Sequence, residues 1–129
     1  MDTLANARVC ADVSTHDIER ARGFYETTLG LTVERLDERG VFYQAGGGTM
    51  LNLFERPHTT SDQAVATFLV ENIESLMFEL RSRGVTFEEY DTPDFKTENG
   101  LFSDGKGFKT SWFKDPDGNI LSLEQLPRE

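Results

Sequence analysis

The sequence predicts an α+β fold in which a single domain, residues 1–129, contains two βαβββ modules, residues 1–60 and 61–129. Two observations carry this prediction. Each half of the chain holds one segment with apolar residues at helical spacing, among several short segments whose apolar residues alternate. The segment Asp17-Ile18-Glu19, where the first helical pattern starts, has a counterpart in Asn72-Ile73-Glu74, where the second starts. The two halves are therefore related as a repeat.

The first module begins with a predicted strand over residues 9–13, where apolar and polar side chains alternate. Asp17 is a suitable N-cap for the helix that follows, because its carboxylate can accept hydrogen bonds from the first free N–H groups. Gly30 is expected to end this helix. Three further strands are predicted at 31–36, 41–45 and 49–54, with turn-forming residues between them.

The second module repeats this order. A strand is predicted at 64–70, and Asn72 is placed to cap a helix. The apolar stripe of this helix comprises Ile73, Leu76, Met77 and Leu80. Three more strands are predicted at 85–90, 108–113 and 119–126. Residues 91–107 have the composition of a long, mobile loop.

The turn before the last strand is specified by Asp115-Pro116-Asp117-Gly118-Asn119, in which Pro116 fixes φ and Gly118 relieves the exit. This hairpin resembles the last hairpin of the vicinal oxygen chelate superfamily, which includes glyoxalase I, extradiol dioxygenases, fosfomycin resistance proteins and bleomycin-binding proteins. Residues 17–25, followed by Leu29-Gly30-Leu31, are similar to that family's first helix and its exit. The resemblance implies curved mixed sheets around a cavity, and a homodimer.

Composition argues against several classes of partner. The formal net charge is −10 and the pI is near 4.6, whereas binding to nucleic acid or to an anionic membrane needs a basic surface. No stretch approaches the roughly 18 apolar residues of a membrane span, and the N-terminus lacks the pattern of a secretion signal. The single cysteine, Cys10, fits a reducing compartment. We therefore expect a cytoplasmic protein that binds neither nucleic acid nor a membrane.

Strand periodicity separates two faces of each sheet, because side chains alternate along a strand and one helix covers only one face. The residues expected to face the helix are all apolar: Val9, Ala11, Val13, Leu51, Leu53, Ala66, Phe68, Val70, Leu121 and Leu123. The opposite set is mixed and, by the resemblance, lines the cavity: Cys10, Asp12, Met50, Asn52, Phe54, Val65, Thr67, Leu69, Ile120, Ser122 and Glu124. Unpaired polar groups on a dry face are costly, so a wet or ligand-filled hollow is expected, with the loop 91–107 overhanging it in the second module.

Metal-dependent members of the superfamily hold a cation with His and Glu side chains from the first, fourth, fifth and eighth strands. The resemblance carries those positions onto Cys10, Asn52, Val65 and Ser122. None of these is His, Asp or Glu, so neither a metal site nor another cofactor is expected. A relocated metal site that uses Asp12 and Glu124 stays an alternative.

The remaining signals favour small-molecule binding. Aromatic residues lie on strands or loops around the predicted cavity: Phe42, Tyr43, Phe54, Phe102, Phe108 and Trp112. The candidate ligand-binding residues are Cys10, Asp12, Asn52, Phe54, Val65, Thr67, Trp112, Ser122 and Glu124. His16 and His58 are expected at the surface. Cys10 is expected to behave as a small buried apolar residue.

Two functions follow from these residues and the resemblance. The preferred one is a metal-free binding protein of the glyoxalase or bleomycin resistance type, which holds a partly aromatic or hydrophobic small molecule. The alternative is an enzyme on the same scaffold, either an isomerase, epimerase or lyase acting on a carbonyl compound or a dioxygenase-like enzyme. It would be metal-free with Asp12 or Glu124 as the base, or would use an unusual divalent metal site.

Overall fold

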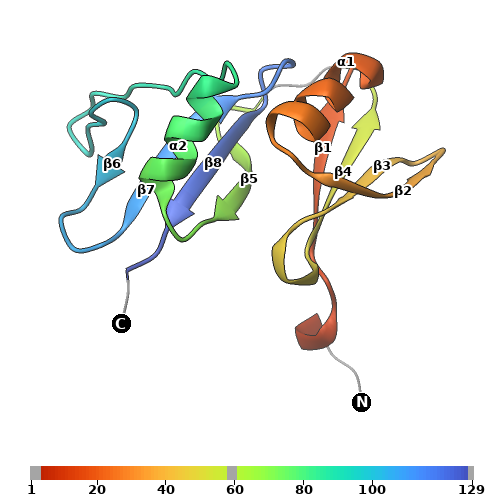
Figure 1. Cartoon of the computed structure of the whole chain (residues 1–129), viewed down its shortest axis with the longest axis horizontal. Helices are drawn as coiled ribbons and strands as arrows, with labels where there is room; N and C mark the ends of the chain where they lie inside the picture. The colour runs from red at the N-terminus through yellow and green to blue at the C-terminus, as the bar shows by residue number, and fades with distance from the viewer. Residues whose placement is uncertain (1–3, 58–60, 128–129) are drawn as a thin grey trace. The chain divides into compact units, whose positions relative to one another are not determined.

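A computed structural model describes residues 4–57 and 61–127. The chain divides into two units, Met1–Thr59 and Thr60–Glu129, and both are drawn in Figure 1. The elements of the first unit are η1 (Leu4–Asn6), β1 (Cys10–Thr15), α1 (Ile18–Gly23), η2 (Phe24–Thr28), β2 (Thr32–Asp37), β3 (Gly40–Gln44), η3 (Gly46–Gly48) and β4 (Met50–Glu55). Those of the second are β5 (Ala64–Leu69), α2 (Ile73–Ser82), β6 (Phe102–Ser103), β7 (Lys109–Lys114) and β8 (Ile120–Gln125).

Each unit contains one mixed four-stranded sheet. The strand order is β1-β4-β3-β2 in the first unit and β5-β8-β7-β6 in the second. In both, the first strand of the unit runs parallel to the last, and the other neighbours are antiparallel. The predicted α+β class with two βαβββ modules is thereby confirmed.

Asp17 caps α1 as its sequence position predicts. Its backbone is extended (φ −147°, ψ 92°), and its carboxylate accepts a hydrogen bond from the N–H of Arg20 at 3.2 Å. The helix continues as the π-helical turn η2. Gly30 then adopts a φ of 78°, which costs glycine little, and the chain leaves for β2.

The core of the first unit lies on the helix side of its sheet. Val13, Leu51 and Leu53 are at most 2% exposed, and Tyr25 of η2 stacks on Tyr43 of β3 with ring centroids 6.1 Å apart. The Tyr43 hydroxyl donates to the Glu26 carboxylate at 2.9 Å, and the Arg22 guanidinium donates to the same oxygen at 2.6 Å. Burial, then the bond to Glu26, raises the pKa of Tyr43, so the phenol remains a neutral donor.

Two residues of the first unit differ from their predicted places. Val9, expected to face the helix, precedes β1 and is 71% exposed. Tyr43, expected near the cavity, is fully buried on the helix side of the sheet. Its place follows from register, because Tyr43 pairs with Leu51, which is a helix-facing residue of β4.

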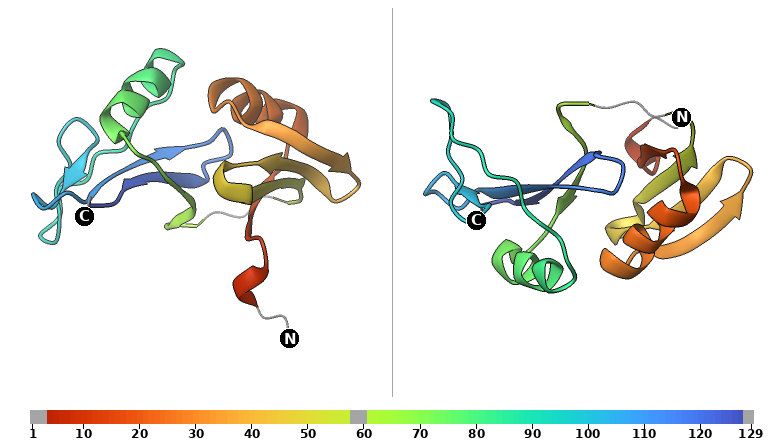
Figure 2. Two further views of the ribbon diagram at one scale, coloured as in Figure 1. Left: turned by 60° about the horizontal axis from the view of Figure 1, so that its bottom comes forward. Right: turned by 90° about the horizontal axis from the view of Figure 1, so that it is seen from above.

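The second unit is built around α2, which lies across one face of its sheet (Figure 2). Asn72 caps this helix by accepting from the N–H of Ser75 at 3.1 Å, as predicted. The buried side chains that α2 contributes are Ile73, Met77 and Leu80, and those that the sheet contributes are Phe113, Leu121 and Leu123. No helix in residues 4–57 and 61–127 is long and apolar enough to cross a membrane.

The predicted strand at 85–90 is wrong. Phe87 makes a single antiparallel bridge to Phe113, and the next strand is β6, which lies inside the predicted loop. Phe87 is only 7% exposed, and the guanidinium of Arg81 from α2 lies 5.1 Å from its ring centroid. The apolar alternation of this segment therefore reflects burial beside α2 and not strand pairing.

The turn between β7 and β8 depends on one buried carboxylate. Asp115 is 5% exposed, and its Oδ1 accepts from the N–H groups of Asp117 and Asn119, both at 2.9 Å. Its Oδ2 accepts from the Asn119 side-chain amide at 2.8 Å. The Asp115 carbonyl closes the β-turn by accepting from Gly118 at 3.0 Å. This side chain sets the register of β7 against β8, and thus which residues occupy the open face.

Replacing Asp115 with Ala should lower the free energy of unfolding by about 2–3 kcal/mol, because buried donors lose a charged acceptor. Urea denaturation measures this loss. The matched control is Asp104→Ala, since Asp104 accepts from two backbone N–H groups, of Lys106 and Phe108, at an exposed turn. The control should cost less than about 1 kcal/mol. Equal losses at the two sites would contradict this role for Asp115.

Candidate functional site: the open faces of the two sheets

Strand pairing identifies the side chains that face away from the helix in the first unit. Asp12 pairs with Asn52, and Asn52 pairs with Phe42 on its other side. Paired residues project from the same face of a sheet, so these side chains form one row across β1, β4 and β3. Cys10 and Phe54 share that face, two residues along their strands.

Asn52 is the most constrained polar group of this row. Its Nδ2 donates to Asp12 Oδ1 at 3.5 Å, while its buried Oδ1 finds no hydrogen-bond partner among the described residues. A Cβ at Gly40 would lie 2.8 Å from that oxygen and 2.3 Å from the Leu53 carbonyl. The close approach therefore requires glycine at position 40.

Cys10 is poorly suited to nucleophilic chemistry. Burial, and secondly the charge of Asp12, raises the pKa of its thiol. Its Sγ lies 3.6 Å from the carbonyl oxygen of Ala11. Because the thiolate is the nucleophile, a raised pKa disfavours the reactive form at neutral pH.

The open face of the second sheet is defined in the same way. Ser122 pairs with Thr67 on one side and with Trp112 on the other, and Glu124 pairs with Leu69 and Thr110. The Thr67 and Ser122 hydroxyl oxygens are 2.6 Å apart, which makes them hydrogen-bond partners. Each therefore already has one polar contact within the protein.

Four aromatic rings meet on or beside this open face: Tyr90, Phe95, Phe102 and Trp112, here called the aromatic group. The Trp112 ring centroid lies 5.2 Å from that of Tyr90 and 5.4 Å from that of Phe95. Phe95 in turn lies 5.7 Å from Phe102 in an edge-to-face arrangement. All four rings are half-buried. The group thus forms a partly accessible apolar wall outside the core under α2.

The segment that carries Phe95 is held by hydrogen bonds. The Thr97 hydroxyl donates to Glu89 Oε1 at 2.6 Å, and the same oxygen accepts from the Gly100 N–H at 2.9 Å. These two bonds lower the pKa of the Glu89 carboxyl. The segment expected as a loop is therefore fastened at Glu89, with Phe95 against Trp112 and Phe102.

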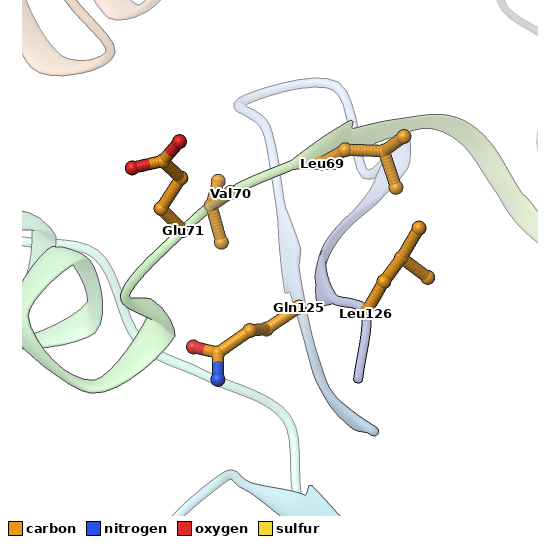
Figure 3. A pocket seen from close by; sticks show the side chains of 5 residues that line it. All are labelled: Leu69, Val70, Glu71, Gln125 and Leu126. Carbon is orange, nitrogen blue, oxygen red and sulfur yellow. The ribbon is translucent and has the colours of Figure 1, made fainter. Parts of the chain in front are cut away.

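A shallow hollow of about 450 Å³ lies where β5 and β8 end. Figure 3 shows Leu69 and Leu126 extending to one side of it, away from Glu71. Leu69 belongs to the open face through its pairing with Glu124. Neither residue belongs to the aromatic group, so this hollow is a separate feature of the second unit.

The four positions that correspond to the family's metal ligands do not fit a divalent cation. Ser122 is 2% exposed and its hydroxyl is bonded to Thr67, and Asn52 and Cys10 supply weak or protonated donors. Val65 has no donor atom and lies where the register of β5 against β8 shifts. Within either unit, the described residues contain no group of three or more His, Cys, Asp or Glu that could hold a metal.

The predicted site residues therefore fall into two sets. Cys10, Asp12, Asn52 and Phe54 share the open face of the first sheet, and Thr67, Trp112, Ser122 and Glu124 share that of the second. Exposed His16 lies 3.5 Å from the guanidinium of Arg20, and His58 is outside the described residues. Sequence reasoning missed Tyr90, which ended a predicted strand, and Phe95, which was a single aromatic residue in a segment predicted to be a loop.

Comparison with known proteins supports this architecture. Residues 8–123 match the model of the Glyoxalase/Bleomycin resistance protein/Dioxygenase superfamily. An integron cassette protein from the mobile metagenome of the Halifax Harbour sewage outfall superposes with a TM-score of 0.69 at 24% identity, over 94% of this chain and 99% of that one. For the oxidase ChaP-H2 the TM-score is 0.69 at 21% identity, with 93% of each chain covered.

A lactoylglutathione lyase from Agrobacterium tumefaciens has the same fold, with a TM-score of 0.64 at 17% identity over 93% of each chain. No curated protein matches the sequence. At these identities the likeness establishes the fold alone, whereas the family model spans most of the chain. With its two βαβββ sheets and this match, the chain belongs to the glyoxalase/bleomycin resistance protein/dioxygenase superfamily.

Proposed function

We propose that the protein binds a partly aromatic or hydrophobic small molecule on the open face of its sheets, without a metal ion, in the manner of a bleomycin resistance type protein. The observation that carries this proposal is the aromatic group. Its rings lie outside the core, and half-buried aromatic rings offer a flat ligand a large contact area. Ligand sites in proteins are commonly apolar walls with a few polar groups that fix orientation.

Polar groups of that kind occur on both open faces. On the second sheet they are the Thr67–Ser122 hydroxyl pair and the Glu124 carboxylate. On the first they are Asp12 and Asn52, whose side chains contact each other. These residues support a role in orienting a ligand. The donor set at the family's metal positions supports binding without a cation.

Replacing Phe95 with Ala should weaken binding of naphthalene about 10-fold, because the ligand loses one face of the aromatic group. Quenching of Trp112 fluorescence measures the dissociation constant, and Trp112 is the only tryptophan of the chain. The matched control is Phe78→Ala, since Phe78 is a 74% exposed ring on the outer side of α2. Equal losses in the two variants, or no saturable quenching in the wild type, would contradict the proposal.

Adding Zn²⁺, Mn²⁺ or Ni²⁺ should leave the unfolding temperature of the purified protein unchanged to within about 1 °C, because a ligand stabilises only a protein that binds it. A rise in the unfolding temperature on adding one of these ions would favour the enzymatic alternative. Its full signature is a stoichiometric metal and a measurable turnover of a carbonyl compound, both lost in Asp12→Asn or Glu124→Gln.

We also propose that the protein acts in the cytoplasm as a homodimer. Leu69 and Leu126 are 67% and 52% exposed beside the hollow of Figure 3, and large apolar side chains of this kind are often buried between subunits. Light scattering during size-exclusion chromatography should give twice the chain mass of 14.6 kDa. Leu69→Lys should reduce this value to one chain. A single-chain mass for the wild type at micromolar concentrations would contradict the dimer.

A further inference from the structure

The buried hydroxyl of Thr110 has no hydrogen-bond partner among the described residues, although Thr110 is only 4% exposed. A buried hydroxyl without a partner is destabilising, typically by about 1–3 kcal/mol. Valine has nearly the same shape and would avoid this cost. On a face that binds a ligand, such a hydroxyl can be satisfied by a group that the ligand brings.

The position of Thr110 indicates which group its hydroxyl could meet. Thr110 pairs with Phe102 of β6 on one side and with Glu124 of β8 on the other. Paired side chains project from the same face, so the Thr110 side chain lies on the open face of the second sheet. Trp112, two residues further along β7, shares this face. Thr110 is therefore next to two members of the aromatic group.

We propose that Thr110 is a specificity-determining residue, whose hydroxyl donates a hydrogen bond to an acceptor on the ring edge of the aromatic ligand. This inference rests on the proposed binding function and adds the ligand's chemical class, a planar aromatic molecule with a ring nitrogen or carbonyl oxygen at its edge. A ligand that lies against the rings of Phe102 and Trp112 would bring such an edge toward Thr110. A threonine hydroxyl can donate or accept a hydrogen bond. Because Glu124 already supplies an acceptor on this face, the group that Thr110 adds is a donor.

The chain offers a matched control at the next position. The Ser111 hydroxyl is also buried and without a partner among the described residues. Ser111 pairs with Leu123, however, and so faces α2 and the core. Thr110→Val and Ser111→Ala each remove one unpartnered hydroxyl, from opposite faces of the same strand. Only Thr110→Val should change which aromatic ligand the protein binds more tightly.

Quinoline and naphthalene test this directly, because they have the same shape and differ in one ring nitrogen. Thr110→Val should weaken quinoline binding by about 5- to 10-fold, the range of one neutral hydrogen bond, and leave naphthalene binding unchanged. Ser111→Ala should change neither dissociation constant. Thr110→Ser, which keeps the hydroxyl, should retain most of the wild-type affinity for quinoline.

Urea unfolding of the ligand-free proteins gives an independent readout. The midpoint for Thr110→Val should equal or exceed that of the wild type, because an unsatisfied hydroxyl is removed. A lower midpoint would show that the hydroxyl has a structural role and would overturn the inference. Equal losses for quinoline and naphthalene would also overturn it while leaving the binding function intact. If neither probe binds the wild type, the binding function fails and this inference fails with it.

Discussion

Each sheet of this protein has a single helical segment to cover it, and strand pairing decides which side chains are left on the other face. Leu51 and Leu53 of β4 point to the helix side, as do Leu121 and Leu123 of β8. The residues next to them along each strand must therefore point away from the helix. In the second unit the Asp115 turn fixes this division, because it sets β7 against β8. A shift of β7 by one residue would move Trp112 to the helix side and bring core residues of β7 to the open face. The composition of the open face is thus a consequence of strand pairing and not of any separate motif.

The helix caps and the faces of the strands could be predicted from the sequence, because the residues that determine them are close together along the chain. Asp17 and Asn72 are short polar side chains ahead of apolar stripes, and both cap helices. The alternation in β4 and β8 assigned Asn52, Ser122 and Glu124 to the face opposite the helix, where pairing places them. The family resemblance added that the sheets are mixed, which no local signal contains, and the strand pairing confirms it.

What the sequence left undetermined depends on long-range contacts. Residues 85–90 alternate like a strand, but Phe87 is buried beside Arg81 of α2 and bridges β7 only once. β6 has two residues, too few for a periodic pattern, and its place is set by pairing with β7. Phe95 lies in a segment whose glycines and acidic residues suggested a loop. The hydrogen bond from the Gly100 N–H to Glu89 helps to hold that segment where Phe95 contacts Trp112. The aromatic group therefore could not be read from spacing, since tertiary contacts assemble it.

The proposed function requires that an organic ligand binds to the aromatic group on the open face of the second sheet and not to the core side under α2. Titration of ¹⁵N-labelled protein with naphthalene, followed by heteronuclear NMR, tests this most directly. We expect saturable shifts of the Trp112 indole N–H and of backbone amides in residues 90–102, 110–112 and 122–124, with little change in α2. Shifts concentrated on α2, or no saturable shift at the Trp112 indole, would contradict it.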